Sequence, residues 1–519
     1  MKLITAQTMQ EIDRRTITEF GVPGLTLMER AGANCAEIIV KRFASATSSM
    51  ALIVAGKGNN GGDGFVIARL LADSGWQVEL ALYADPAGLA GDARTNYERL
   101  PEGVATTVHP DTAVLADLCS KATVIVDALF GTGLNSPLAP SYAAAVNAVN
   151  SSGRPIVAVD IPSGIDASTG RTCGTAVKAA LTVTFAAAKL GHFLYPGTSH
   201  CGELLVTDIG IPQELLAAAP GVTLIDAAHS AALLRPRNRT DHKGNCGHAL
   251  IVAGSVGKSG AAAMAANSAV RSGAGLVTLA APDAINQILE IKTTEAMTLP
   301  VTSTPHGTFA PGAIDEILAC SAGKSVVALG PGVGSKQAVT EVIRVLAKSV
   351  ELPLVIDADG LNALSGRIDI LSKRKAPYII MTPHPGEMAR LTGRSVADIE
   401  SDRLASARNF AQQHNVYLLL KGARTVIAAP DGELAMNASG NPGMATGGCG
   451  DVLTGVITAL VAQGYEPFAA CCLGAFIHGL AGDMVAAEKG EIGMNATDIQ
   501  EMLPLAIRSL SLASSQNQL

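Results

Sequence analysis

Charged residues are scarce in this sequence, and no long basic run occurs. They make up 16% of the 519 residues, against 48% hydrophobic residues, and the formal net charge is −7. Nucleic acid is bound through clustered lysine and arginine, so we expect no nucleic-acid partner. The composition does not exclude a small anionic ligand held by local backbone dipoles. The abundant alanine and glycine suit buried parallel strands covered by helices of small residues.

Cysteine pairs and long apolar runs are also missing. The nine cysteines include no CxxC pair, and Cys471 and Cys472 lie in an apolar helical pattern. We therefore expect buried, reduced thiols rather than disulfides or a zinc site. Residues 1–20 alternate charged and apolar side chains, unlike a signal peptide, and the apolar stretch 471–487 contains a histidine and an acid. The sequence predicts no membrane span and a soluble, cytoplasmic protein.

Short β-branched runs recur between helical patterns along the chain. Each run ends in glycine, proline, an acid or histidine, as parallel strands do where they open onto a ligand crevice. The length allows two or three domains. We predict an α/β protein with two doubly wound domains and a boundary near Gly221. The runs are ALIVAG, TVIVDALFGTG, PIVAVDIPSG, HALIVAGS, SVVALGPGVG, PLVIDADG and YIIMTPHPGE.

A glycine-rich turn, GKGNNGGDG (56–64), follows the first of these runs. Its glycines allow a sharp turn, and we expect Asp63 or Gly64 to open a helix whose first amides accept a phosphate. The alternative is a plain turn capped by Asp63. The pattern is neither GxGxxG nor a P-loop, so those mechanisms do not transfer.

Neighbouring strand ends add oxygen atoms to this first site. Asp127 and Asp160 each end a run, and Ser163 follows shortly after the second. Such ends converge in an open sheet, so Asn60, Asp127, Asp160 and Ser163 are expected to meet at one crevice. Oxygen ligands of this kind suit a hard cation. Capping of a helix or turn is the alternative role for the two aspartates.

The motifs LMERAG, GKGNNGGDG, DALFGTGL and VDIPSGIDASTG resemble the NAD(P)H-hydrate epimerase family over residues 1–215. The resemblance implies that the NNGGD and GTGL loops bind the hydrated nucleotides NADHX and NADPHX. It also implies a potassium ion held around Asn60, Asp127 and Ser163. For the proton shuttle, and for stabilising a cationic ring, we choose Asp160. The implied substrate contacts are Asn59, Asn60, Gly61, Gly62, Asp63, Gly131, Thr132, Gly133, Leu134, Asn135, Ser136, Pro137 and Asp160.

A second glycine run, GGCGD (447–451), precedes the apolar run VLTGVITALVA. Gly447, Gly448 and Gly450 allow successive amides to face one concavity, and a helix that starts there attracts an anion. Asp451 is then placed to accept a proton from an attacking hydroxyl, as in phosphoryl transfer. The alternative is that Asp451 only caps the helix.

Other strand ends in this half carry glycines and titratable residues. A lone histidine beside prolines is more often a turn residue than a catalyst, but several such strand ends in one domain favour a catalytic site. They include Gly330, Gly332 and Gly334, then Asp357 and Asp359, then His384 and Glu387, and finally Lys421 and Gly422.

The motifs HKGNCGHALIVAGS, GPGVG, TPHPGE, KGART and GGCGD resemble, in this order, the ADP- or ATP-dependent NAD(P)H-hydrate dehydratase family over residues 225–510. That family is itself similar to ribokinase-like kinases. The resemblance implies ADP as phosphoryl donor, Mg²⁺ on its phosphates, Asp451 as catalytic base, and release of AMP and phosphate. Cys449 departs from the small residues expected in this loop and is small enough to fit. The implied hydrate contacts are Ala261, Gly334, His384 and Asp451, and the implied nucleotide contacts are Lys421, Gly422, Ala423, Arg424, Thr425 and Gly450.

Together the two halves predict a bifunctional enzyme that epimerises the R and S hydrates and dehydrates the S hydrate to NAD(P)H. One rival is a ribokinase-like small-molecule kinase fused to a non-catalytic nucleotide-binding module. Another is that residues 1–215 form only a scaffold. The small-residue helix 260–275 suggests a homo-oligomer, although the same composition suits an internal interface.

Overall fold

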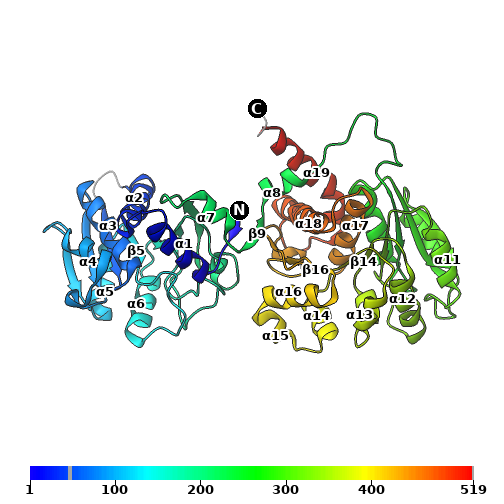
Figure 1. Cartoon of the computed structure of the whole chain (residues 1–519), viewed down its shortest axis with the longest axis horizontal. Helices are drawn as coiled ribbons and strands as arrows, with labels where there is room; N and C mark the ends of the chain where they lie inside the picture. Colours follow the sequence, from blue (N-terminus) through cyan, green and yellow to red (C-terminus); the bar gives the residue numbers. More distant parts are fainter. Residues whose placement is uncertain (45–48, 517–519) are drawn as a thin grey trace. The chain divides into compact units, whose positions relative to one another are not determined.

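The chain folds into two compact units, Lys2–Val222 and Thr223–Leu519, with Met1 counted in the second. We call them the N-terminal and C-terminal units and describe each by itself. The computed structural model describes residues 1–44 and 49–516, with side chains as far as residue 512 (Figure 1).

The N-terminal unit is built on a sheet in which every neighbouring pair of strands is parallel. A short strand, β1 (Lys2–Leu3), precedes the first helix. In spatial order the sheet contains β4 (Ala105–Val108), β3 (Gln77–Leu82), β2 (Met50–Ala55), β5 (Val124–Ala128), β6 (Ile156–Val159), β7 (Leu181–Phe185) and β8 (Glu203–Thr207).

Helices cover both faces of this sheet because its strands are apolar on both sides. Ile53 packs into a cluster with α1 to α4 and α7, whereas its neighbour Leu52 packs against α5 and α6. The helices are α1 (Ala6–Thr18), α2 (Gly24–Phe43), α3 (Asn59–Asp73), α4 (Gly91–Glu98), α5 (Thr112–Lys121), α6 (Pro140–Ser151) and α7 (Gln213–Ala218).

The strand order of the N-terminal unit reverses between β2 and β5. From β2 the chain moves outward to β3 and β4, and it then returns to the other side of β2 and continues to β8. Ligands of open α/β sheets bind at such a reversal, beyond the carboxyl ends of the strands. The loops that meet there begin at Gly56 and Leu129.

The C-terminal unit has a larger, mostly parallel sheet. Only the pairs β16–β17 and β17–β18 are antiparallel among its described pairs. The order is β9 (Val222–Ile225), β18 (Leu434–Asn437), β17 (Val426–Ala428), β16 (Tyr417–Leu420), β15 (Ile379–Met381), β14 (Leu354–Ile356), β13 (Val326–Leu329), β10 (His248–Val252), β11 (Leu276–Pro282) and β12 (Met297–Val301).

Helices cover both faces of this sheet as well. One apolar cluster joins α9, α17, α18 and α19 to alternate strand residues, while α11, α12, α13 and α16 lie across the other face (Figure 1). The helices are α8 (Ala227–Leu233), α9 (Ser259–Arg271), α10 (Asn286–Lys292), α11 (Ala313–Ser321), α12 (Gln337–Ser349), α13 (Asp359–Leu364), α14 (Pro385–Thr392), α15 (Val396–Ser401), α16 (Arg403–His414), α17 (Cys449–Ala462), α18 (Pro467–Lys489) and α19 (Ala496–Gln516).

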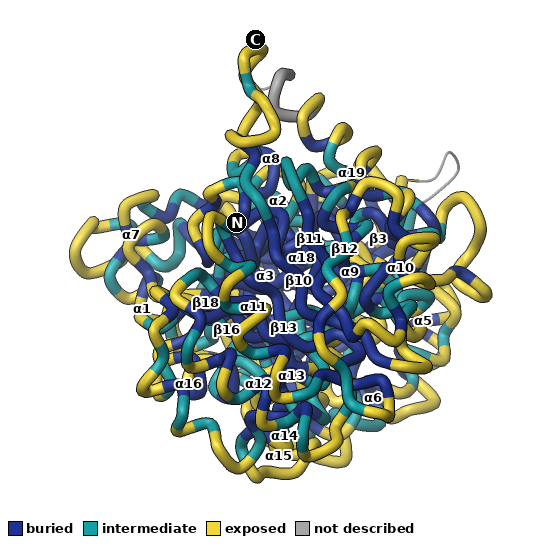
Figure 2. Tube along the Cα trace, turned by 90° about the vertical axis from the view of Figure 1, so that its right-hand side faces the viewer, coloured by how far each residue is buried: buried dark blue, intermediate teal, exposed yellow. Residues whose placement is uncertain are grey.

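The order of the C-terminal strands reverses between β10 and β13. The chain runs from β10 outward to β11 and β12, and then from β13 across to β16. Both strands at the reversal are buried, as their dark blue trace in Figure 2 shows. The predicted fold class, α/β with two doubly wound units, is confirmed.

Helix α18 corrects the expectation that no segment could span a membrane. It is long and apolar enough by length and composition, but 72% of its most apolar window is buried inside the structure. Packing against α17 and α19 therefore accounts for its apolar character. The prediction of unpaired thiols is confirmed, because all nine cysteines are free and only Cys320 is partly exposed.

Candidate active sites

The glycine-rich turn after β2 is the first turn of a helix. Helix α3 starts at Asn59, its N-cap is Gly58, and no side chain caps it. The expectation that Asp63 or Gly64 opens the helix is therefore wrong, and so is the alternative that Asp63 is the cap. Asp63 instead lies one turn inside α3.

The glycines of this turn are required for space rather than for backbone freedom. Gly61 and Gly62 do not have a positive φ. A Cβ on Gly61 would collide with the carbonyl oxygen of Gly56, and one on Gly62 would lie 2.6 Å from the sulfur of Met28. Because a side chain would push α3 away from its neighbours, these glycines let its N-terminus approach the β2 loop closely.

A cavity of about 610 Å³ opens where these loops meet in the N-terminal unit. Of the predicted contacts, Gly61, Gly62 and Pro137 do not line it, and neither do Asp127 and Ser163. The predicted residues that do line it are Asn59, Asn60, Asp63, Gly131, Thr132, Gly133, Leu134, Asn135, Ser136 and Asp160.

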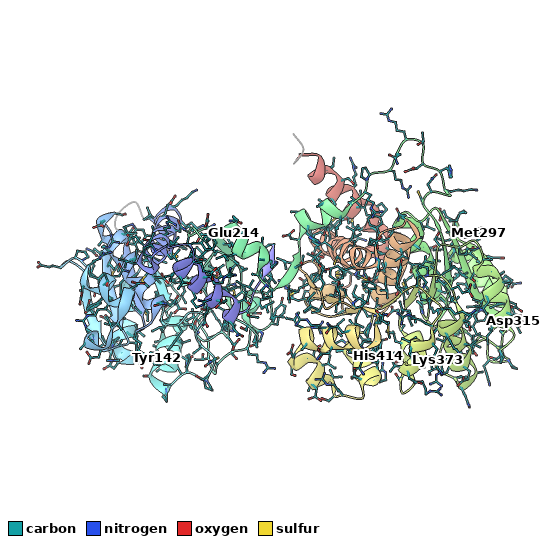
Figure 3. All side chains as sticks on the ribbon, viewed as in Figure 1. Tyr142, Glu214, Met297, Asp315, Lys373 and His414 are labelled. Carbon is teal, nitrogen blue, oxygen red and sulfur yellow. The ribbon has the colours of Figure 1, made fainter. Side chains whose placement is uncertain are left out.

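An aromatic pair forms part of the cavity wall. Tyr142, labelled in Figure 3, comes from α6, and its ring lies 4.8 Å from that of Phe130 in an edge-on arrangement. The Tyr142 hydroxyl donates to the carbonyl oxygen of Tyr83 at 3.2 Å. This contact fixes the ring and gives the cavity a rigid apolar surface.

Asp127 and Ser163 hold each other at the ends of neighbouring strands. One carboxylate oxygen accepts from the Ser163 hydroxyl at 2.6 Å and the other from the Ser163 amide at 2.8 Å. Asp127 is 1% exposed. Burial raises its pKa to about 6, against the lowering effect of these hydrogen bonds. Among the described residues, no lysine or arginine forms an ion pair with it.

Asn60 is the remaining residue of the predicted cation site. It is buried, and its side-chain nitrogen has no hydrogen-bond partner among the described residues. Because the oxygen and nitrogen of an amide are exchanged by a flip, the same position can present an oxygen. A buried carboxylate without an ion-pair partner and an amide nitrogen without a hydrogen-bond partner, both among the described residues, fit a hard cation with oxygen ligands.

Asp160 follows β6 in a strained conformation and is fixed by a buried lysine. Its φ is +66°, which is unusual for a residue other than glycine. One carboxylate oxygen accepts from Lys189 Nζ at 2.5 Å and from the Thr184 hydroxyl at 2.9 Å. The ring of His192 also donates to the Asp160 carbonyl oxygen at 2.9 Å. Burial acts to raise the pKa of Asp160, but Lys189 outweighs it and lowers that pKa.

Two further acids, Asp13 and Asp63, share the cavity wall with Asp160 and Lys189. Burial, and then the charges of Asp160 and Asp13, raise the pKa of Asp63 well above its usual range. Burial raises the pKa of Asp13 to about 6, and Lys189 opposes that rise. Sequence reasoning missed Asp13 and Lys189, because each stands outside any motif and becomes informative only once buried beside the others.

In the C-terminal unit the GGCGD run forms the start of α17. The N-cap is Gly448, with φ +97°, and no side chain caps the helix. Asp451 is in the first turn, so the alternative that it caps α17 is wrong. A Cβ on Gly450 would lie 3.2 Å from Lys421 Nζ, so the bare helix end faces that amine. Helix N-termini of this kind favour anions.

Lys421 is the centre of a charged cluster, which we call the Lys421 cluster, formed with Asp357, Glu387 and Asp451. Lys421 Nζ donates to Asp357 at 2.8 Å and lies 3.9 Å from a Glu387 oxygen. Burial acts to lower the pKa of Lys421, but the two carboxylates outweigh it and raise that pKa. The other oxygen of Asp357 accepts from the Thr454 hydroxyl of α17 at 2.6 Å.

Asp451 has the proton affinity of a base that works near neutral pH. Burial, followed by the charge of Asp357, raises its pKa to about 7, although Lys421 opposes that rise. A carboxylate with this pKa can take a proton from a hydroxyl and release it again. Asp451 therefore combines a suitable pKa with a position at a helix N-terminus.

The loop after β13 lies beside this cluster at the reversal of strand order. Gly330 has φ +124°, and a Cβ there would collide with the carbonyl oxygen of Asp357. The Gly334 amide donates to Asp359 at 2.9 Å, and Lys258 donates to the same oxygen at 2.8 Å. A Cβ on Gly332 would lie 3.0 Å from the Cβ of Ala261, which belongs to α9.

His384 is the N-cap of α14 rather than a free side chain. Its Nδ1 accepts from the amides of Gly386 and Glu387, and Glu387 accepts from the His384 amide at 2.8 Å. Burial lowers the pKa of His384. The imidazole is thus neutral at pH 7, with its Nε2 edge half exposed and able to donate.

The predicted nucleotide loop follows β16 and is held in an unusual conformation. Gly422 and Arg424 have φ of +146° and +61°. The Thr425 hydroxyl donates to the Gly422 carbonyl oxygen at 3.1 Å. Arg403, which lies in none of the sequence motifs, donates to the Lys421 carbonyl oxygen at 3.1 Å. Ala423 lies within this turn. The Lys421 side chain belongs to the cluster described above.

The described residues contain no group of three or more His, Cys, Asp or Glu side chains arranged to hold a metal ion. Mg²⁺ that arrives on nucleotide phosphates needs only one or two protein carboxylates. Glu387 and Asp357 are the carboxylates nearest the lysine that would face such phosphates.

Comparisons with known proteins match both units. A family model described as NAD(P)H-hydrate dehydratase matches residues 249–505, and one described as YjeF-related protein N-terminus matches residues 24–191. The bifunctional NAD(P)H-hydrate repair enzyme Nnr of Moorella thermoacetica is 43% identical over 98% of this chain and 97% of its own length. The Escherichia coli enzyme of the same name is 36% identical over 92% of this chain and 89% of its own.

A solved structure matches the C-terminal unit. It is the ADP/ATP-dependent NAD(P)H-hydrate dehydratase from Bacillus subtilis, co-crystallised with ATP and Mg²⁺. The identity is 28%, the TM-score is 0.50, and the match covers 56% of this chain and 100% of that one.

Proposed function

We infer that both units act on hydrated NADH and NADPH, because this chain belongs to the family of bifunctional NAD(P)H-hydrate repair enzymes. The resemblance identified from the motifs is confirmed by full-length relatives. The enzyme is an isomerase and a lyase: it epimerises the R and S hydrates, and it dehydrates a hydrate at the expense of a nucleotide. We assign epimerisation to residues 1–215 and dehydration to residues 225–510.

Asp451, at the start of α17, is the base in the dehydration. The hydroxyl oxygen on C6 of the S hydrate attacks the terminal phosphoryl group of ADP, and its proton passes to Asp451. The bond to AMP breaks, and the C6 oxygen now carries the phosphoryl group. The lone pair of the ring nitrogen expels phosphate, and loss of the proton from C5 restores NAD(P)H. The observation that carries this assignment is the position of Asp451 in the first turn of α17, beside Lys421 and Asp357, and its raised pKa agrees with it.

The surrounding residues supply charge and position in this step. Lys421 and the amides at the start of α17 stabilise the negative charge of the phosphoryl group. Ala261, Gly334 and His384 are assigned to the hydrate, and Gly422, Ala423, Arg424, Thr425 and Gly450 to the nucleotide. Bound Mg²⁺ would neutralise phosphate charge, with Glu387 and Asp357 as its candidate protein contacts. We propose ADP rather than ATP as the donor.

The epimerisation requires the bond between C6 and its hydroxyl to break and form again. Asp160 supports this step chiefly as a fixed negative charge beside the cationic ring, because Lys189 and Thr184 hold its carboxylate and keep it ionised. The predicted contacts that line the cavity, together with Gly61, Gly62 and Pro137, are assigned to the hydrated nucleotide. Potassium held by Asn60, Asp127 and Ser163 would compensate the buried charge of Asp127.

Product analysis tests the proposed function. The purified chain is incubated with mixed NADH hydrates and either ADP or ATP, and the hydrates, phosphate and NADH absorbance are followed. We expect both epimers to disappear, with one phosphate released per NADH formed. A stable phosphorylated product would instead support the rival small-molecule kinase. Loss of only the S hydrate would support the rival in which residues 1–215 are a scaffold.

We propose three further properties. The potassium site predicts that exchange of K⁺ for a bulky organic cation slows epimerisation and lowers the melting temperature of the wild type, but not of Asp127→Asn. Sedimentation tests the homo-oligomer suggested by the helix that contains Ala261. Fractionation of cells tests the cytoplasmic location.

A further inference from the structure

The N-terminal cavity contains more titratable groups than the proposed reaction has used. Its charged lining residues come from several elements: Asp13 from α1, Lys57 from the β2 loop, Asp63 from α3, Asp92 from α4, Asp160 after β6, and Lys189 before the turn Leu190–His192. His192 and Cys35 are buried as well. Burial lowers the pKa of His192 to about 4 and raises the pKa of Cys35 well above its usual range, so burial favours the uncharged form of both. Asp13, Lys57, Asp63 and Asp92 have no assigned chemical role among these groups, and of the four only Asp13 and Asp63 are linked electrostatically to Asp160 and Lys189.

The ion pair between Asp160 and Lys189 is fully engaged. Lys189 Nζ donates to Asp160, to the Thr184 hydroxyl and to the Phe185 carbonyl oxygen, and the lysine is 1% exposed. Its three N–H donors are thus all used. Both charges are stabilised where they stand, so neither group is suited to exchange a proton in each turnover.

Asp13 and Asp63 are in the opposite situation. Neither carboxylate forms a hydrogen bond or an ion pair with any described residue, and both face the cavity. Asp13 lies on the side of α1 that also presents Met9, Gln10 and Ile17 to the cavity. Asp63 is one turn inside α3, and the charge of Asp13 acts on it. The protonation state of each carboxylate therefore depends on the environment of the cavity and on the molecule bound in it.

We propose that Asp13 and Asp63 are the acid and base of the epimerisation, a role that rests on the proposed epimerase function. Asp63 in its neutral form gives a proton to the C6 hydroxyl. The C6–O bond breaks, its electron pair leaves with water, and the ring nitrogen lone pair forms a double bond to C6. Water then adds to the other face of C6 and loses its proton to Asp13. The reverse direction uses the two carboxyl groups in exchanged roles.

The protonation of the pair agrees with these roles. Burial and the charges of Asp160 and Asp13 raise the pKa of Asp63 well above its usual range, which favours the neutral form that can donate a proton. The pKa of Asp13 is raised only to about 6, so this group is ionised at pH 7 and able to accept. Two carboxyl groups with separated proton affinities are a common arrangement for acid–base catalysis.

Substitution of Asp13 tests the proposal. In Asp13→Asn, kcat for epimerisation of isolated R hydrate should fall about 100-fold with little change in KM. The rise of wild-type activity through pH 6 should disappear, and Asp13→Glu should restore part of the rate. The matched control is Glu11→Gln on the exposed side of α1, which should keep wild-type kinetics. Because dehydration takes place in the other unit, the melting temperature of the N-terminal unit in each variant, compared with that of the wild type, reports whether this unit is folded.

The outcomes separate this inference from the proposed function. A wild type that does not speed epimerisation at all would contradict the epimerase assignment itself. An active wild type whose Asp13→Asn variant keeps its rate and pH profile would overturn the acid–base pair alone. A second measurement uses ¹⁸O-labelled water: we expect one labelled oxygen at C6 per epimerisation, and epimerisation without label would overturn C6–O cleavage.

Discussion

The two sites occupy the same place in their folds but hold their buried carboxylates differently. Each lies where the strand order reverses, between β2 and β5 in one unit and between β10 and β13 in the other. In the N-terminal cavity the buried Lys189 is fully engaged by Asp160 and its neighbours, and Asp13 and Asp63 form no ion pair with any described residue. In the C-terminal unit a lysine and a bare helix end face the same space.

This difference suits the intermediates of the two reactions. An epimerisation through a cationic ring is helped by unpaired carboxylates, whereas phosphoryl transfer is helped by a lysine and helix amides that face the phosphoryl group. Binding the same hydroxylated nucleotide does not require the same charges. The comparison teaches that the fold sets the position of each site, while buried charges decide which reaction occurs there.

The largest expected effect separates the two activities. Asp451→Asn keeps the shape of the helix start but removes the base, so dehydration should fall about 10³-fold. Epimerisation by the same variant should be unchanged, because Asp451 lies in the other unit. Parallel assays of both reactions check this. Equal loss of both activities would contradict independent sites.

The second-largest effect is expected for removal of the buried Lys189, which should destabilise only the N-terminal unit. Lys189→Met leaves Asp160 buried without its partner, a change that lowers the free energy of unfolding by about 3 kcal/mol. Denaturant unfolding followed by epimerase and dehydratase activity distinguishes the two units. Addition of Asp160→Asn should recover part of the stability, and no recovery would argue against a charge effect.

The pH dependence of dehydration should reflect Asp451. Below its pKa of about 7 the carboxyl group is protonated and cannot accept a proton, so kcat/KM should rise as pH increases and level off above that value. Between pH 6 and 7 we expect kcat/KM to rise about 5-fold. Rates measured with saturating nucleotide check it. A profile that is flat from pH 5.5 to 8 would exclude Asp451 as the base.

The smallest effect concerns the glycines of the second site. A Cβ on Gly450 would lie 3.2 Å from Lys421 Nζ and 3.7 Å from Asp357, whereas one on Gly447 would meet nothing within 4 Å. Gly450→Ala should therefore raise KM for the nucleotide about 5-fold, and Gly447→Ala should raise it less. Steady-state kinetics at varied nucleotide concentration measures both. The reverse order would show that contact with Lys421 is unimportant.

Much of the fold could be predicted because buried parallel strands are continuous apolar runs. ALIVAG and SVVALGPGVG became β2 and β13, each followed by the glycines that form a site. The antiparallel strands β17 and β18 were not among the predicted runs, although β14 and β15, which were, are no longer than they are. The start of α3 was misplaced because Asn59 and the following glycines look like a turn, while tertiary packing makes them helical.

The sites were less predictable than the fold. Asp451 could be proposed as the base from the sequence because glycines precede it and an apolar helical run follows it. Asp13 and Lys189 are isolated in ordinary sequence, and only folding brings them to one cavity, where burial changes their chemistry. Loss of water around a charge is a property of the folded unit, so no local pattern of residues reports it.

The most direct test of the account supplies isolated R hydrate and ADP to the purified chain. If each unit acts on the same nucleotide through its own site, R hydrate should be converted completely to NADH at an enzyme-dependent rate. Asp160→Asn and Asp451→Asn should each block this conversion, the first before S hydrate appears and the second after it. Persistence of R hydrate at the rate without enzyme, beside normal use of S hydrate, would contradict the account.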